Sequence, residues 1–127
     1  MPIAYWCILA GALLPYVAVA AAKFSPGSGY DNARPRETEG AMTGFRARAV
    51  AAHHNGFEAF ALFAVAVLAA VQLGQEGAAL DRLCLAWVIL RLAYTAAYCG
   101  GWPRTRSVLW TAAIGVALAI LTLPAWG

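Results

Sequence analysis

The polar side chains that could take part in chemistry occur at helical spacing within apolar stretches of the sequence. In the first group, Arg48, Asn55 and Glu58 are separated by seven and three positions, so they lie on one face of a helix. His54 precedes Glu58 by four positions and lies on nearly the same face. A guanidinium group, an amide and a carboxylate on one face predict a site that binds carboxylates and an amine.

A second group of polar residues follows the same pattern nearer the C-terminus. Arg91, Tyr94 and Tyr98 are separated by three and four positions and share one helical face. Arg106 and Ser107 begin the last apolar stretch, where free backbone N–H groups and the helix dipole favour a bound anion. Together the two groups predict a polar, arginine-rich cavity between helices that suits an anionic, amphiphilic ligand. The alternative is a structural polar network that only holds the helices together.

Glu58 and Arg91 are the two charged residues that fall well inside apolar stretches. A charge at membrane depth costs a few kcal/mol and therefore needs a partner. Counted along their helices, Glu58 lies about 15 Å and Arg91 about 10 Å from the same end. We therefore predict a direct ion pair between them. The alternative is that each pairs with another group, including one on another subunit.

The composition indicates that membrane-spanning helices carry these groups. Of the 127 residues, 62% are hydrophobic, nine are Lys or Arg and six are Asp or Glu. In this chain 12% of the residues are charged, whereas about a quarter are charged in a soluble domain. This apolar composition excludes a disordered tail, a disulfide scaffold and a typical cytosolic enzyme. We predict an all-α membrane protein, a bundle of four transmembrane helices in a single domain that covers residues 1–127. The predicted spans are approximately 2–22, 49–73, 80–98 and 107–126.

Basic residues are distributed unevenly between the predicted loops. The loop on one side of the membrane carries only Arg82, whereas the two loops on the other side carry seven basic residues. The positive-inside rule places the basic side in the cytoplasm and both termini outside it. Residues 1–22 carry no charge and lack the basic start of a signal peptide, so we interpret them as a retained helix. The seven basic residues are Lys23, Arg34, Arg36, Arg46, Arg48, Arg104 and Arg106.

Neither nucleic acid nor a metal ion is an expected partner. The net charge of +3 comes from basic residues that flank apolar stretches, not from a basic face of a soluble domain. The adjacent His53 and His54 point about 100° apart on a helix, and no third metal ligand is evident.

The first polar group belongs to a stretch that resembles a known family. Residues 46–60, RARAVAAHHNGFEAF, resemble the second-helix signature of the MAPEG family, the membrane-associated proteins of eicosanoid and glutathione metabolism. Residues 30–37 resemble the loop of the short bacterial branch of this family. Residues 91–98 and 104–107 resemble its helix-three to helix-four region. The resemblance extends from about Ala22 to Trp110, and the predicted topology agrees with it.

The resemblance implies one four-helix subunit of a homotrimer, with sites that lie between subunits and face the cytoplasm. It implies glutathione as a co-substrate, with Arg106 stabilising the thiolate and Ser107 donating a hydrogen bond beside it. Arg106 and Ser107 are the implied catalytic residues. The implied glutathione-binding residues are Arg48, His54, Asn55, Glu58, Arg91, Tyr94 and Tyr98.

Four positions depart from the best-studied glutathione-using members of the family. Ala51 and His54 stand where an Arg is common, Tyr94 replaces a frequent His, and Trp110 replaces a frequent Tyr. The loss of two Arg side chains weakens carboxylate binding at those points.

The expected function is that of an integral membrane protein of a bacterial inner membrane that contacts lipid. It resembles glutathione-dependent transferases or peroxidases that act on apolar electrophiles or lipid peroxides. One alternative is a non-catalytic member of the family that binds lipid or acts as a scaffold. Another is a small transporter, motivated by Glu58 and Arg91, although the outer half of every span lacks polar residues that would continue a pathway.

Overall fold

The computed structural model describes residues 1–127, and every regular element in it is a helix. Four helices are long and apolar enough to cross a membrane, which confirms the predicted all-α bundle of four spans. A short fifth helix lies between the first two spans. The helices are α1 (Ile3–Phe24), α2 (Pro35–Ala41), α3 (Gly44–Gln72), α4 (Ala78–Gly100) and α5 (Pro103–Trp126).

Two helix starts lie earlier in the chain than the apolar pattern indicates, and both affect the site. Helix α3 begins at Gly44, before the predicted boundary at residue 49, so Arg48 belongs to its second turn. Helix α5 begins at Pro103, because a proline at the first helical position already has a helical φ and needs no N–H partner. Arg106 consequently lies one turn inside α5.

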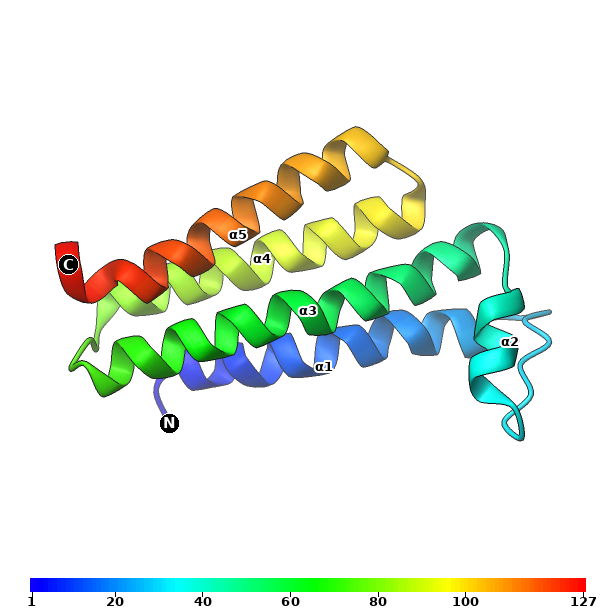
Figure 1. Ribbon diagram of the computed structural model, residues 1–127, viewed down its shortest axis with the longest axis horizontal. Helices are drawn as coiled ribbons and strands as arrows, with labels where there is room; N and C mark the ends of the chain where they lie inside the picture. Colours follow the sequence, from blue (N-terminus) through cyan, green and yellow to red (C-terminus); the bar gives the residue numbers. More distant parts are fainter.

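The four long helices form an alternating bundle. Helices α1 and α4 run in one direction and α3 and α5 in the other (Figure 1). Helix α1 packs mainly against α3, and α4 packs mainly against α5. Both termini lie at one end of the bundle, whereas α2 and the α4–α5 connection lie at the opposite end. That opposite end carries the arginine-rich connections.

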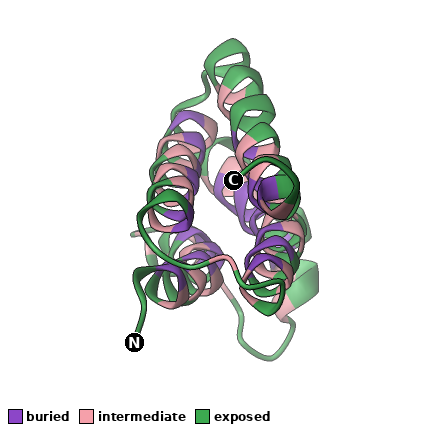
Figure 2. Cartoon of the chain, turned by 90° about the vertical axis from the view of Figure 1, so that its left-hand side faces the viewer, coloured by how far each residue is buried: buried purple, intermediate pink, exposed green.

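Small side chains allow the helices to approach closely. Many of the buried residues are alanines, and small residues at helix contacts are typical of packing within lipid. Larger core residues stack between them: the rings of Phe63 and Trp87 are parallel, with centroids 3.8 Å apart. A Cβ atom at Gly11 would lie 2.9 Å from the Trp87 ring, so only glycine fits there. Buried residues face the centre of the bundle, and exposed residues face outward (Figure 2).

Large apolar side chains cover the outside of the bundle. Trp6, Leu13, Val65 and Ile89 are all exposed, although each belongs to a long helix. A soluble protein rarely exposes so much contiguous apolar surface. This surface fits helices that contact lipid.

Pro15 fixes the position of α1 against α3. Its ring lies on Gly56, where an added Cβ atom would be only 2.8 Å from Pro15 Cγ. The buried His53 donates a hydrogen bond from Nδ1 to the Pro15 carbonyl oxygen at 2.8 Å. These contacts fix the rotation of α3 and hence the direction in which Asn55 points.

Helix α2 is tied to the bundle through the buried carboxylate of Glu39. Its oxygens lie 2.9 Å from Lys23 Nζ at the end of α1 and 3.1 Å from Arg36 Nη1. Burial alone would raise the pKa of Glu39, but hydrogen bonds and charge attraction from Lys23 and Arg36 outweigh it and hold the pKa below its ordinary value. A separate contact joins the start of α3 to the residue after α1, because Arg46 Nε donates to Ser25 Oγ at 2.9 Å.

Candidate functional site

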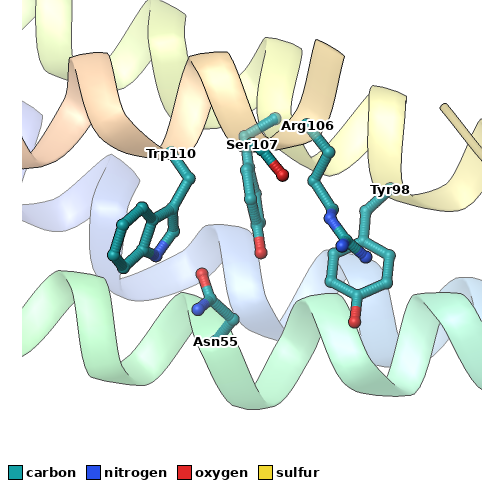
Figure 3. Close-up of a pocket in the computed structure, with 6 residues that line it drawn as sticks. Asn55, Tyr98, Arg106, Ser107 and Trp110 are labelled. Atoms are coloured by element: carbon teal, nitrogen blue, oxygen red, sulfur yellow. The ribbon is translucent and has the colours of Figure 1, made fainter. Parts of the chain in front are cut away.

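A cavity of about 250 Å³ lies between α3, α4 and α5 in the half of the bundle that faces the α4–α5 connection. Figure 3 shows Asn55 pointing from α3 toward α5, with Trp110 and Ser107 extending from α5 toward it. Five of its six lining residues come from the two polar groups of the sequence. The lining residues are Asn55, Tyr94, Tyr98, Arg106, Ser107 and Trp110, and we call this space the first cavity.

Arg106 is the only cation that lines the first cavity. Its guanidinium carbon lies 4.4 Å from the centre of the Tyr98 ring, in a cation–π contact that orients the side chain. None of the four salt bridges of the chain involves Arg106, so no carboxylate neutralises it. The first cavity therefore presents one positioned, unpaired guanidinium group.

Ser107 and Trp110 complete the α5 side of the first cavity. The Ser107 hydroxyl donates to the Pro103 carbonyl oxygen at 3.0 Å, one turn back along the helix. Its proton is therefore engaged, and donation to a ligand would require the hydroxyl to rotate. Trp110 was not among the predicted site residues, although its position four residues after Arg106 places it on the same face of α5.

Arg91 lies behind two residues of the first cavity, which it contacts, and it is almost completely buried, with 2% of its surface exposed. Its Nη2 donates to Asn55 Oδ1 at 2.9 Å, and its guanidinium carbon lies 4.0 Å from the centre of the Tyr94 ring. Its Nη1 has no hydrogen-bond partner. Arg91 thus orients two residues of the cavity, Asn55 and Tyr94, without lining the cavity itself.

The predicted direct ion pair between Glu58 and Arg91 does not form within the chain. Asn55 lies between them: it accepts from Arg91 and donates from Nδ2 to Glu58 Oε2 at 3.5 Å. Glu58 is exposed, whereas Arg91 is buried. The depth estimate placed Glu58 and Arg91 near each other. The Asn55 amide separates them, because its oxygen accepts from Arg91 and its nitrogen donates to Glu58.

Arg48 lines a second cavity of about 280 Å³ at the end of the bundle. Its Nε donates to the Cys99 carbonyl oxygen at 3.1 Å, near the C-terminal end of α4. The second cavity shares Tyr98 and Arg106 with the first. Its lining residues are Arg48, Ala97, Tyr98, Gly101, Trp102, Pro103 and Arg106.

His54 is the predicted site residue that lies apart from the others. It is exposed and lines neither cavity. It is adjacent to Asn55, so the two side chains diverge by about 100° and cannot face the same cavity. The spacing to Glu58 placed His54 near the correct face, but Glu58 itself lies at the exposed edge of that face.

The lining of both cavities favours an anionic ligand. Neither cavity contains an acidic residue, and together they contain two arginines. The first cavity adds an amide, a serine hydroxyl, two tyrosines and a tryptophan, which suit a ligand with both polar and apolar parts. Gly101, Trp102 and Pro103 of the second cavity were not predicted, because their role depends on how the α4–α5 turn folds back.

Comparison with known proteins gives one match. The model of the MAPEG family matches residues 3–126, which include all four long helices and every residue that lines the two cavities. No curated protein and no solved structure matches the chain.

Proposed function

Because the chain belongs to the MAPEG family, we propose that it is a membrane enzyme that transfers glutathione to apolar electrophiles or uses glutathione to reduce lipid peroxides. The observation that carries the proposal is the unpaired guanidinium group of Arg106 in the first cavity. A fixed cation in a partly enclosed site favours the charged form of a bound thiol.

The residues of the first cavity suit the groups of a glutathione molecule. Its thiol supplies the nucleophile in this chemistry. Arg106 would hold the sulfur as a thiolate, because a nearby cation lowers the pKa of a thiol and raises its nucleophilic fraction. Asn55 would bind the peptide part through its amide, with Arg91 and Glu58 fixing the orientation of that amide.

Ser107 would act as a second donor to the sulfur. Its hydroxyl lies in the first cavity but donates to Pro103 in the structure. We propose that it turns from the Pro103 carbonyl toward the anionic sulfur. Such a charge-assisted hydrogen bond is stronger than the one it replaces.

The aromatic side chains that line the first cavity favour the binding of an apolar second substrate. Trp110 is partly exposed and comes from the lipid-facing helix α5. An electrophile dissolved in the bilayer could reach the cavity along these side chains without crossing water. We propose that the cavity is completed by neighbouring copies in a homotrimer and faces the cytoplasm of a bacterial inner membrane.

A second candidate is a non-catalytic protein that uses the same cavity to bind lipid. The observation in its favour is that Arg106 is the only cation of the first cavity, since position 51 is an alanine and His54 points elsewhere. Fewer cations mean weaker binding of a ligand with two carboxylates.

Glutathione binding and turnover distinguish the two candidates. Purified protein in lipid nanodiscs is titrated with glutathione and then assayed for conjugation to an aryl chloride. The enzyme proposal expects binding at millimolar glutathione or below and turnover that falls by about 10²–10³ in Arg106→Ala. Arg104→Ala is the matched control, because Arg104 is exposed and lines neither cavity. Absence of binding at millimolar glutathione would favour the lipid-binding candidate.

A further inference from the structure

The second cavity brings two arginines together without a carboxylate. Arg48 comes from α3 and Arg106 from α5, and both line the same space of about 280 Å³. The salt bridges of the chain use Lys23, Arg34 and Arg36, but neither of these two arginines. Two like charges that share a partly enclosed space repel each other, and an anion between them would remove that repulsion.

Both guanidinium groups are held in place by contacts that leave donors free. Arg48 uses Nε for the Cys99 carbonyl oxygen, so its two terminal nitrogens stay available. Gly101 lies close beside it, because an added Cβ atom there would be 3.5 Å from Arg48 Cζ. Arg106 rests on the Tyr98 ring by its face and makes no side-chain hydrogen bond within the chain. Ordered side chains lose little further entropy when a ligand binds.

We infer that the second cavity is an oxyanion subsite that binds a carboxylate or a phosphate between Arg48 and Arg106. Planar guanidinium groups bind both of these anions through paired hydrogen bonds. The subsite adjoins the first cavity through Tyr98 and Arg106, so a single extended ligand can occupy both. In this role Arg48 supplies the positive charge that Ala51 does not.

Two sources of the oxyanion fit this position. One is a carboxylate of glutathione, which rests on the proposed function of the first cavity. The other is the phosphate of an anionic lipid headgroup, because the cavity lies at the end of the bundle beside Trp102, which is 63% exposed. Tryptophan is enriched where a bundle meets the lipid headgroups. The same two arginines would bind either anion.

The test compares Arg48→Met with Arg104→Met in the full-length protein. Methionine keeps an apolar stem of similar length and removes the charge, and Arg104 lines neither cavity. Each protein is titrated with glutathione, and with glutathione esterified at its glycine carboxylate, in zwitterionic nanodiscs. Retention of phosphatidylglycerol is measured by native mass spectrometry. Helicity and thermal midpoint verify that each variant folds. Arg48→Lys provides a second variant that keeps the positive charge but loses the paired N–H donors of the guanidinium group.

An Arg48-dependent change in either arm supports the subsite. If the carboxylate occupies it, Arg48→Met weakens glutathione binding at least tenfold, the ester binds the unaltered protein equally weakly, and Arg48→Lys is intermediate. If lipid occupies it, Arg48→Met abolishes phosphatidylglycerol retention and leaves glutathione affinity unchanged. The same loss of phosphatidylglycerol retention, in a protein whose unaltered form binds no glutathione, would reject the proposed function and keep the subsite.

The subsite is overturned if Arg48→Met behaves like Arg104→Met in both arms. With glutathione binding intact and dependent on Arg106, the same result would leave the proposed function standing. The two proposals can therefore fail separately.

Discussion

Arg91 and Arg106 each lie against a tyrosine ring of α4, yet their surroundings give them different roles. Arg91 is buried and bonded to Asn55, so it belongs to the scaffold of the site. Arg106 lines both cavities and makes no ion pair, so its guanidinium group remains available to a ligand. Burial and pairing, rather than residue type, separate Arg91, which is bonded within the bundle, from Arg106, which is available to a ligand.

At the residue scale, Asn55→Ala is expected to destabilise the protein through Arg91. The change leaves Arg91 without any hydrogen bond from its terminal nitrogens, because Nη1 has none already. An unsatisfied buried donor costs about 1–3 kcal/mol. The free energy of unfolding in mixed detergent micelles measures the loss, and His54→Ala, an exposed neighbour, is the control.

A double-mutant cycle tests whether the loss passes through Arg91. Arg91→Met combined with Asn55→Ala should lose clearly less stability than the sum of the two single variants. Additive losses would show that Asn55 does not act on Arg91.

The sequence predicted which residues gather at the site better than how they pair. Helical spacing identified Asn55 and Tyr98, because a helix repeats regularly and their faces follow from it. Arg106 was identified by its place at the start of the last apolar stretch. Spacing did not reveal that Asn55 separates Glu58 from Arg91, since that depends on side-chain rotation and on the distance between two helices. Trp110 was missed as a lining residue, although its spacing of four from Arg106 places it on the same face of α5.

Among the elements, the contact between α1 and α3 depends on a glycine. Gly56→Ala would place a methyl group 2.8 Å from Pro15 Cγ and force the helices apart, at a cost of about 1–3 kcal/mol. Gly115→Ala is a matched control, because it also lies within a long helix but has open space around it. The control should be neutral or stabilising by up to about 1 kcal/mol. Equal thermal midpoints for the two variants would contradict this packing.

Helix α2 is expected to loosen in acid. The pKa of Glu39 lies below its ordinary value of 4.5, so its ion pairs stabilise α2 fully above that value and are lost as the pH falls through the lowered pKa. Hydrogen-exchange protection of Pro35–Ala41, corrected for intrinsic exchange rates, should drop between about pH 6 and about pH 3. Glu39→Gln should show low protection throughout this range. A pH-independent protection in the unaltered protein would contradict the prediction.

The long helices could be predicted because each contains an apolar stretch of membrane-spanning length. The first residues of α3 and α5 were harder to predict from the sequence. These helices begin at Gly44 and Pro103 because of backbone conformation, which apolar patterning does not encode. The short helix α2 escaped prediction because Pro35 and Gly40 resemble loop residues, and its docking depends on Lys23 in the last turn of α1.

For the whole molecule, the bundle separates an arginine-rich end from the end that carries both termini. We predict that the arginine-rich end faces the cytoplasm. Alkaline phosphatase fused after Gly127 should be active and green fluorescent protein fused there should be dark. Fusions inserted at Gly29, in the loop before α2, should give the opposite pattern. A fluorescent C-terminal fusion would reverse the assigned orientation.

The proposed function depends on Arg106 stabilising a thiolate in the first cavity. Its most direct test is the ultraviolet difference spectrum of glutathione added to the protein in nanodiscs at neutral pH, recorded for the unaltered chain, Arg106→Ala and Arg104→Ala. We predict a thiolate band that saturates with glutathione, persists in Arg104→Ala and disappears in Arg106→Ala. A thiolate band of the same size in Arg106→Ala, or bound glutathione with no band in the unaltered protein, would contradict it.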